Sequence, residues 1–326
     1  MHDLVRQAIL ATSSHNTQCW RFQIVGSSIS ITPDMARRCP VVDPDDHHVF
    51  VSLGCALENM VQATLANALR TDPRFDPGGD GVIVVSLEPT QKRDSPMSQA
   101  ISERQCTCGD DNGQPISPAE LLLLEKAGTG KDVSVQLLTA RPAMESVLEY
   151  VVAANTMQMN DGAFVAELKT SIRFSAGEAL RTGDGLFAEA TGNPALPRWL
   201  GSPLMALFYT PKSESERYTR QIRNSAGIAV FVSERSDASG RGGPVLRAIR
   251  PTGHGAGHPQ CVPEPARRGR RHPASVRLLA RTRVGGLQAR PGGAIRAWRS
   301  DAAVDAAAGA GGHCLKARSC PRCATR

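Results

Sequence analysis

The residues with the clearest chemical potential lie in one short polar segment around Asn16. The segment combines the hydroxyls of Ser13 and Ser14 with the amides of Asn16 and Gln18. An amide both donates and accepts hydrogen bonds, so this set suits a planar ligand whose edge alternates donors and acceptors. The segment lies between a predicted helix and a predicted strand, where free backbone N–H groups can also face a ligand. A plain polar loop anchored by a buried Trp20 is the alternative.

Three further groups of residues could do chemistry. Arg104 carries a guanidinium that can grip a phosphate through two parallel hydrogen bonds, although a lone Arg is commonly a solvated surface residue. Cys106 and Cys108 form a C-x-C pair, but no second ligand pair lies nearby in the sequence to complete a zinc site. Near the C-terminus, a group of residues imitates a zinc-ligand cluster, namely His313, Cys314, Cys320 and Cys323.

Hydrophobic periodicity predicts the elements that position these residues. Apolar residues at helical spacing predict helices over about residues 3–12, 53–69 and 144–152. Apolar runs predict strands at residues 20–25, 28–32, 82–85, 133–138 and 226–233, and the first two form a hairpin around Gly26. Helices and strands mix without strict alternation, so the sequence predicts an α+β fold.

The charge of the chain divides sharply along its 326 residues. Residues 241–326 carry +14 and the remainder carries −7, which together give the formal net charge of +7. Arg, Ala and Gly supply 45 of those last 86 residues, so the segment has too little apolar surface to offset the entropy of ordering it. We therefore expect 241–326 to be non-native or disordered.

The first 240 residues have the mildly acidic composition of a soluble cytoplasmic protein. No stretch has the roughly 18 apolar residues of a membrane span, and the N-terminus lacks the features of a signal peptide. We expect no membrane partner. The first five cysteines are expected to be reduced thiols.

The polar segment resembles the SSxNxQPW signature of nitroreductases, and the wider chain resembles the Acg family of actinobacterial nitroreductase-like proteins. Each supporting phrase is weak alone, but they occur in order over about residues 4–236. The phrases are DP at 43–44, SLGCALEN at 52–59, ISER at 101–104, EL at 167–168, RF at 173–174, GDGL at 183–186, GNP at 192–194, WLG at 199–201 and SAG at 225–227.

The resemblance implies a nitroreductase-like fold in which one chain holds two similar halves, an internal pseudo-dimer around one FMN that can be monomeric. The halves are expected at residues 1–95 and 96–240, the second incomplete, with 241–326 as a basic tail. Four side chains would approach the flavin from the first half, and Arg104 would open a phosphate-binding segment in the second. The four are Ser13, Ser14, Asn16 and Gln18. No residue is assigned a catalytic or metal-binding role, because the flavin carries the redox chemistry.

Three positions depart from the family pattern. Cys19 stands where the signature has Pro, which makes the loop less rigid. Cys108 stands where the second Arg of the phosphate signature is expected, so phosphate binding should be weaker. Ser171 stands where a Trp is expected before Ile172 and Arg173.

The C-terminal phrases of the family are missing from residues 240–326 but fit a shifted reading frame. When the codons are displaced by one base, residues 249–268 permit FALQATALGIRNAFLNQPVE without a break. Residues 295–312 permit FGRG, MP and RRPVQAV at the family's spacing. Two blocks in one shifted frame favour a frameshift near residues 237–241. The cysteine-rich cluster is then an accident of the wrong frame.

The expected function is that of an FMN-dependent oxidoreductase, impaired in this translated form. By resemblance, it would take hydride from NAD(P)H and reduce a small acceptor such as a nitro compound or a quinone. One alternative is a protein that binds or sequesters FMN without turnover. A second, less favoured alternative is a basic tail that binds nucleic acid.

Overall fold

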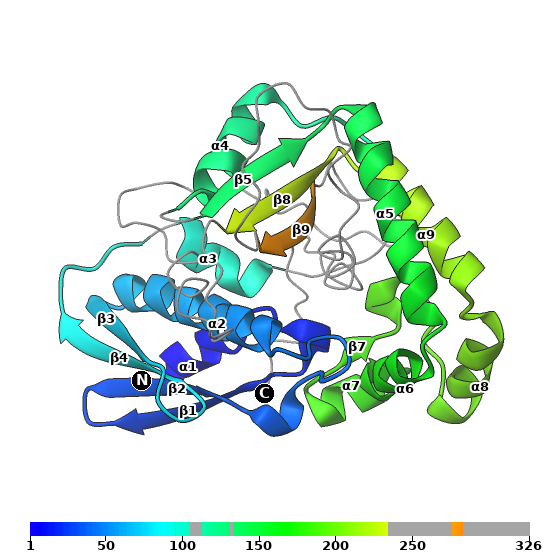
Figure 1. The fold of residues 1–326 in the computed structure, drawn as a ribbon. Helices are drawn as coiled ribbons and strands as arrows, with labels where there is room; N and C mark the ends of the chain where they lie inside the picture. Colours follow the sequence, from blue (N-terminus) through cyan, green and yellow to red (C-terminus); the bar gives the residue numbers. More distant parts are fainter. Residues whose placement is uncertain (95, 105–112, 131–132, 234–275, 283–326) are drawn as a thin grey trace.

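The computed structural model describes residues 1–94, 96–104, 113–130, 133–233 and 276–282, the last of these as backbone (Figure 1). Helices and strands alternate irregularly along these residues, and the sheets contain mainly antiparallel pairs. The α+β class predicted from the sequence is therefore confirmed. The domain boundaries at residues 95 and 240 stay predictions.

A four-stranded antiparallel sheet organises the N-terminal part of the chain. Its order is β1-β2-β4-β3, formed by β1 (Trp20–Val25), β2 (Ser28–Pro33), β4 (Val82–Pro89) and β3 (Leu69–Asp76). The β1–β2 hairpin pairs Val25 with Ser28 across a turn in which Gly26 has a φ of +53°. Alternate side chains on the two central strands are fully buried, namely Ile29, Ile31, Ile83 and Val85. Period-two alternation therefore gives this sheet one core face.

Two helices cover the core face of this sheet, α1 (His2–Ala8) and α2 (His47–Ala66) (Figure 1). Leu53 and Met60 of α2 are fully buried in one cluster with strand residues such as Ile29. Ile101, on α3 (Pro96–Glu103), joins the same cluster. Among the described residues, α2 is the one helix long and apolar enough to cross a membrane, and just over half of it is buried inside the structure.

The C-terminal part carries a helical layer and a second sheet. The helices are α4 (Pro118–Gly128), α5 (Arg141–Met159), α6 (Gly162–Ser171), α7 (Ala176–Thr182), α8 (Arg198–Phe208) and α9 (Pro211–Arg223). The sheet has β8 (Gly227–Ser233) in its centre, with β5 (Val133–Leu138) antiparallel on one side and β9 (Val276–Thr282) parallel on the other. Short strands β6 (Ile172–Arg173) and β7 (Leu186–Phe187) pair separately. Helices α5 and α9 pack through Leu148, Val151 and Ile222.

Strand β9 is an exception to the expectation that residues 241–326 are largely disordered. Its seven residues pair in register with the whole of β8, from Gly227 opposite Val276 to Ser233 opposite Thr282. A strand edge leaves a row of N–H and C=O groups that need partners, and the backbone of Val276–Thr282 provides them along β8. The remainder of 241–326 lies outside the described residues.

The segment after β2 joins the two parts of the molecule. Cys39 and Val42 pack in one buried cluster with Met159, Phe164 and Leu168. In addition, the Glu167 carboxylate on α6 accepts hydrogen bonds from the backbone N–H groups of residues 41 and 42, at 2.9 and 3.1 Å. Apolar packing and two charge-assisted hydrogen bonds therefore hold this segment against α6.

Candidate functional site

The loop between α1 and β1 holds the polar segment singled out from the sequence. It contains a single 3₁₀ turn, η1 (Ser14–Asn16). His15, Asn16 and Gln18 all have positive φ, at 47°, 52° and 55°. The left-handed region is sparsely populated by residues other than Gly and costs about 1–3 kcal/mol per residue. Three such residues within four positions mean that surrounding contacts must hold this backbone in place.

Some of those contacts come from inside the loop. The N–H of Asn16 donates to the Ser13 carbonyl and the N–H of Thr17 donates to the Ser14 carbonyl, both at 2.9 Å. The N–H of Gln18 donates to the Ser13 hydroxyl at 3.1 Å. The expectation that free backbone N–H groups face a ligand is therefore wrong at these three positions, because the tight turns use the donors locally. At these positions the side chains, and not the backbone N–H groups, remain to contact a ligand.

The strongest outside contact joins Asn16 to Gly185, a residue in the loop between α7 and β7. The Asn16 amide donates to the Gly185 carbonyl at 3.1 Å, and the Gly185 N–H donates back to the Asn16 carbonyl at 2.9 Å. Gln18 then donates to the Asn16 side-chain oxygen at 2.9 Å. Gly185 has a φ of +82°, and a Cβ there would lie 2.6 Å from the Ser171 carbonyl oxygen. Only glycine fits this close approach.

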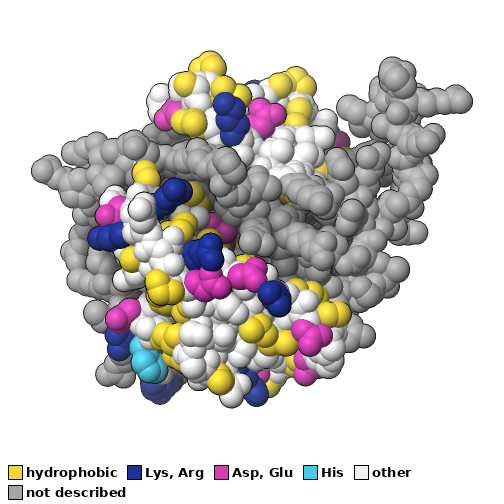
Figure 2. Space-filling model, turned by 90° about the vertical axis from the view of Figure 1, so that its left-hand side faces the viewer, with side chains coloured by type: hydrophobic (Ala, Val, Ile, Leu, Met, Phe, Trp, Pro, Cys, Tyr) yellow, Lys and Arg dark blue, Asp and Glu magenta, His cyan; other side chains and the backbone are white. Residues whose placement is uncertain are grey.

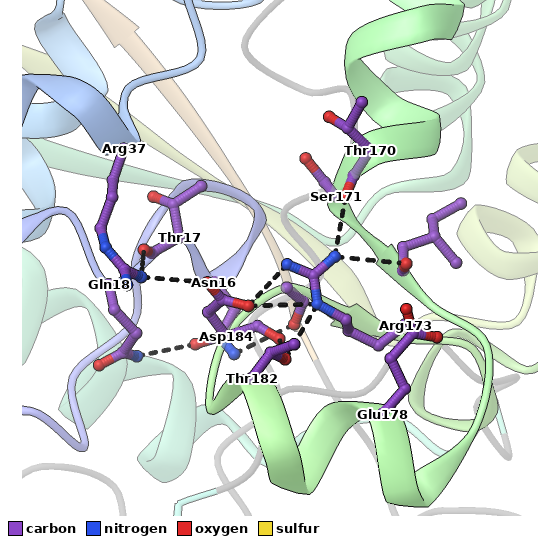
Figure 3. A network of polar contacts seen from close by, with 12 residues as sticks. Asn16, Thr17, Gln18, Arg37, Thr170, Ser171, Arg173, Glu178, Thr182 and Asp184 are labelled. Atoms are coloured by element: carbon purple, nitrogen blue, oxygen red, sulfur yellow. Dashed lines mark hydrogen bonds and ion pairs between the residues drawn. The ribbon is translucent and has the colours of Figure 1, made fainter.

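Asp184 supports the same junction through two arginines (Figure 3). Arg173 donates to one carboxylate oxygen through Nη2 at 2.6 Å and Nε at 3.1 Å. Arg37, on the 3₁₀ turn η2 (Met35–Arg37), donates to the other oxygen at 3.0 Å and to the Thr17 carbonyl at 3.1 Å. Because both partners of the Arg173 pair are largely buried, this pair is better shielded from water than a surface ion pair. Asp184 thus links the polar loop, η2 and β6.

A layer of buried polar groups lies beneath the loop. The N–H of Ser14 donates to the Ser52 hydroxyl at 3.4 Å, and that hydroxyl donates to the His48 carbonyl at 2.6 Å. Cys19 lies almost fully buried beside Ser52. Burial raises the pKa of the Cys19 thiol, while hydrogen bonds from Ser52 and Thr17 oppose the rise. Cys19, which replaces the Pro of the signature, is therefore a protonated core side chain.

Asp43 caps the start of α2 from within this layer. Its carboxylate accepts the N–H of His48 at 2.9 and 3.0 Å and the N–H of Val49 at 3.2 Å. Burial raises the Asp43 pKa to about 6, and the two backbone donors oppose the rise. Burial also lowers the pKa of both His47 and His48. The helix N-terminus favours the charged carboxylate, but desolvation is the larger effect.

His15 and Cys39 form a buried contact that the sequence did not indicate. The Cys39 Sγ lies 3.6 Å from the His15 Nδ1. A Cys beside a His suggests an activated nucleophile, but burial raises the Cys39 pKa to about 12, and the charges of Glu167 and Asp43 add to the rise. At neutral pH the group is a thiol, so this contact serves packing rather than nucleophilic chemistry. No sequence signal links the two residues, since they are 24 positions apart.

Arg104 reaches the same region from the end of α3. Its guanidinium donates to the carbonyl of Leu10, in the segment that leads from α1 into the polar loop. The four predicted loop residues are thus bonded to one another or to their immediate support, and Arg104 contacts the chain just before them. Cys106 and Cys108 lie outside the described residues.

No group of three or more metal-ligating side chains occurs within the described ranges of the chain. The residues His313 to Cys323 lie outside those ranges. Cys19, Cys39 and Cys55 are reduced thiols that form no disulfide, as expected. A scan against models of known protein families finds no match, and a search of curated proteins finds no related sequence.

Proposed function

We propose that the polar loop binds the edge of an FMN ring and that the intact protein is an NAD(P)H-dependent oxidoreductase of the nitroreductase type. The supporting observation is the conformation of the loop backbone, in which three non-glycine residues have φ values in the left-handed region. Such strain commonly persists where a ligand site needs a fixed geometry. The two hydrogen bonds between Asn16 and Gly185, and the bond that Gln18 donates to Asn16, hold that geometry before any ligand arrives.

The donors and acceptors of the loop fit the polar edge of a flavin ring. Gln18 uses one N–H on Asn16, which leaves its second N–H and its side-chain oxygen. Asn16 keeps one amide N–H after its bond to Gly185. Ser13 and Ser14 add hydroxyls to the same loop. This set would orient the ring, and Arg104 would hold the phosphate in place of the Leu10 carbonyl.

When bound, FMN accepts hydride from NAD(P)H and passes electrons to a small acceptor such as a nitro compound or a quinone. The chain's own residues would bind and orient the cofactor. The one titratable side chain among residues 13–18 is His15, which is buried against Cys39. We therefore assign proton transfer to no side chain of this loop.

An FMN-binding protein without turnover is the first alternative, and the same loop geometry supports it. Oxidation of NAD(P)H in the presence of an acceptor separates the two. Nucleic-acid binding is the second alternative and rests on the charge of +14 within residues 241–326. On the face in Figure 2, the described side chains of both signs are interspersed with apolar ones and form no single basic field. Binding that weakens steeply with salt and needs only the tail would support this alternative.

The decisive experiment titrates FMN against Gln18→Ala and Gln23→Ala in a chain with the reading frame restored. Flavin fluorescence quenching reports the affinity. Gln23 is an exposed residue on β1, so its loss controls for the change in side-chain chemistry. We expect Gln18→Ala to weaken binding about tenfold, the effect of one hydrogen bond, and Gln23→Ala to leave it unchanged. Equal affinities for the two variants would remove the loop from the flavin site.

A further inference from the structure

Helix α8 presents an apolar face to solvent. Trp199, Pro203, Ala206 and Leu207 are all exposed, with Trp199 at 77% and Leu207 at 67% of their full surface. They follow the spacing i, i+4, i+7, i+8, which places them on one side of a helix. Figure 1 shows α8 at the outer edge of the helical layer. The solvent-facing side of a helix in a soluble protein is normally polar, so an apolar face in this position is unusual.

The opposite side of α8 explains how the helix is held. Gly201 is its one buried residue, and a Cβ added there would lie 2.5 Å from a ring carbon of Phe174. The Arg198 guanidinium lies 5.0 Å above the Phe174 ring and pairs with Glu178 on α7. Within the described part of the chain, the inner side of the helix is therefore already packed. The apolar stripe, formed by Trp199, Pro203, Ala206 and Leu207, lies outside that packing.

The stripe is large enough to be a binding surface. Trp199, Leu207 and the adjacent Phe208, which is 66% exposed, together offer roughly 400 Å² of apolar surface. Patches of about 300–600 Å² commonly mark interaction sites. A standard interface buries about 800 Å² per partner, with an apolar centre and a polar rim. The stripe would supply the centre of such an interface.

We propose that a second copy of this chain covers the stripe, with the two α8 helices packed antiparallel across a two-fold axis near Pro203. Trp199 and Leu207 each lie four residues from Pro203, so the axis brings Trp199 of one copy against Leu207 of the other. The row 199–203–207 is an i±4 ridge, the type that packs into the grooves of a second helix. The small side chains of Pro203 and Ala206 allow close approach at the crossing point.

Charge favours a second copy over a lipid surface. Residues 199–211 contain no charged side chain, so a two-fold axis brings no like charges together. Interfacial helices that bind anionic lipids carry Lys or Arg beside their apolar face. Here the neighbouring Arg198 is already paired with Glu178. An antiparallel pair also aligns the helix dipoles favourably. This proposal does not depend on the flavin site.

Sedimentation velocity of the full-length chain over a concentration series tests the pairing. We expect a monomer–dimer equilibrium that Leu207→Arg weakens about 30-fold or more, the effect of losing one central interface residue. Val25→Arg is the matched control, because Val25 is similarly exposed at 62% but lies on β1. Circular dichroism verifies that each variant is folded. If Leu207→Arg fails to fold, Ala206→Glu repeats the test by placing two like charges near the axis.

A rescue experiment tests the geometry of the pair. Trp199→Lys and Leu207→Glu should each disrupt the dimer alone, and the double variant should recover association at low salt, because each Lys would face a Glu of the other copy. Three results would overturn the proposal. They are a chain that stays monomeric throughout the series, a dimer unaffected by Leu207→Arg, and a monomer that binds phosphatidylcholine–phosphatidylglycerol vesicles through Trp199.

Discussion

Asn16 and Gly185 lie 169 positions apart in the chain and are joined by two hydrogen bonds, one from each partner. The contact ties the strained loop before β1 to the turn before β7. It also occupies part of the amide that the sequence assigned wholly to a ligand. Asn16 is therefore a residue that holds the loop, and Gln18 is the residue of the two with more hydrogen-bonding capacity left for a ligand.

Replacing Asn16 with Ala should destabilise the protein and loosen the loop. The change leaves the Gly185 carbonyl and the Gln18 amide without their partner, which costs about 1–3 kcal/mol. The free energy of unfolding in urea measures the loss. Asn193→Ala is the control, because that exposed amide bonds only to Thr191 two residues away. Equal stability of the two variants would show that the Asn16 contact adds nothing to folding.

Gly185→Ala should reduce the stability of the protein more than the same substitution at a glycine without close neighbours. The left-handed φ costs about 1–2 kcal/mol for any residue with a Cβ. The new methyl group would also meet the Ser171 carbonyl oxygen at 2.6 Å. Gly26→Ala separates the two effects, because Gly26 has a φ of +53° but no atom within 4 Å of the added carbon. We expect Gly185→Ala to lower the free energy of unfolding by at least about 1 kcal/mol more than Gly26→Ala.

Asp184→Asn should weaken the junction of the two parts of the molecule. The carboxylate accepts charge-assisted hydrogen bonds from both Arg37 and Arg173, and an amide can replace only some of them. We expect a loss of about 1–2 kcal/mol in the free energy of unfolding. Asp3→Asn removes a fully solvated pair with Arg6 and should produce no measurable change. A loss of similar size in both variants would mean that shielding from water is unimportant here.

The raised pKa of Asp43 should make stability depend on pH. Between the ordinary value near 3.8 and about 6, the folded state holds a proton at Asp43 that the unfolded state has lost. The contribution of this group is then fully present below about pH 4 and is lost as pH rises through 6. We expect the loss to be on the order of 3 kcal/mol.

Asp43→Asn should flatten that part of the profile, because an amide does not titrate and its oxygen can still accept a backbone N–H. The difference between the variant and the original chain isolates Asp43 from His47 and His48. The pKa of each histidine is lowered by burial, so their contribution changes in the opposite direction, rising with pH up to about 6.5. Asp45→Asn, an exposed change in the same segment, is the control. A pH-independent difference would show that Asp43 is ionised throughout.

Restoring the reading frame near residue 240 should recover FMN binding that the translated chain has lost. On the proposed frameshift, the shifted frame would remove the arginine-rich C-terminal segment that the resemblance places near the phosphate, whereas Cys108 is present in both chains. Loss of two or three charge-assisted bonds weakens binding by on the order of 10³-fold. Flavin absorbance of the two purified chains measures the effect. Stoichiometric FMN in the unrepaired chain would show that the C-terminal segment is dispensable.

Local sequence rules determined several elements of this protein. The β1–β2 hairpin followed from two apolar runs around Gly26, and β5 and β8 followed from buried-strand composition. These elements were predictable because the order of apolar and polar residues within a short stretch of sequence indicates which side chains are buried. Strand β3 was missed because charged residues and Pro73 interrupt the apolar pattern of Leu69–Asp76. Its backbone hydrogen bonds with β4 stabilise the strand although its own sequence has a low strand propensity.

The start of α2 shows where periodicity stops being informative. The pattern predicted a helix from residue 53, whereas α2 begins at His47. Asp43 holds the N–H groups of His48 and Val49, and this cap lies upstream of the apolar pattern that signals the helix. In the same way, composition predicted no order in 241–326, and the open edge of β8 provided a partner for Val276–Thr282.

The sequence by itself determined which side chains could contact a ligand, because amide and hydroxyl chemistry is a property of Ser13, Ser14, Asn16 and Gln18. Only the tertiary structure decided how those groups are used. The tight turns use the backbone N–H groups of Asn16, Thr17 and Gln18 within the loop. The Gly185 carbonyl accepts one N–H of the Asn16 side-chain amide. Asn16 and Gly185 are 169 positions apart, so whether they form a hydrogen bond depends on how distant elements pack. A local sequence pattern contains no information about that packing.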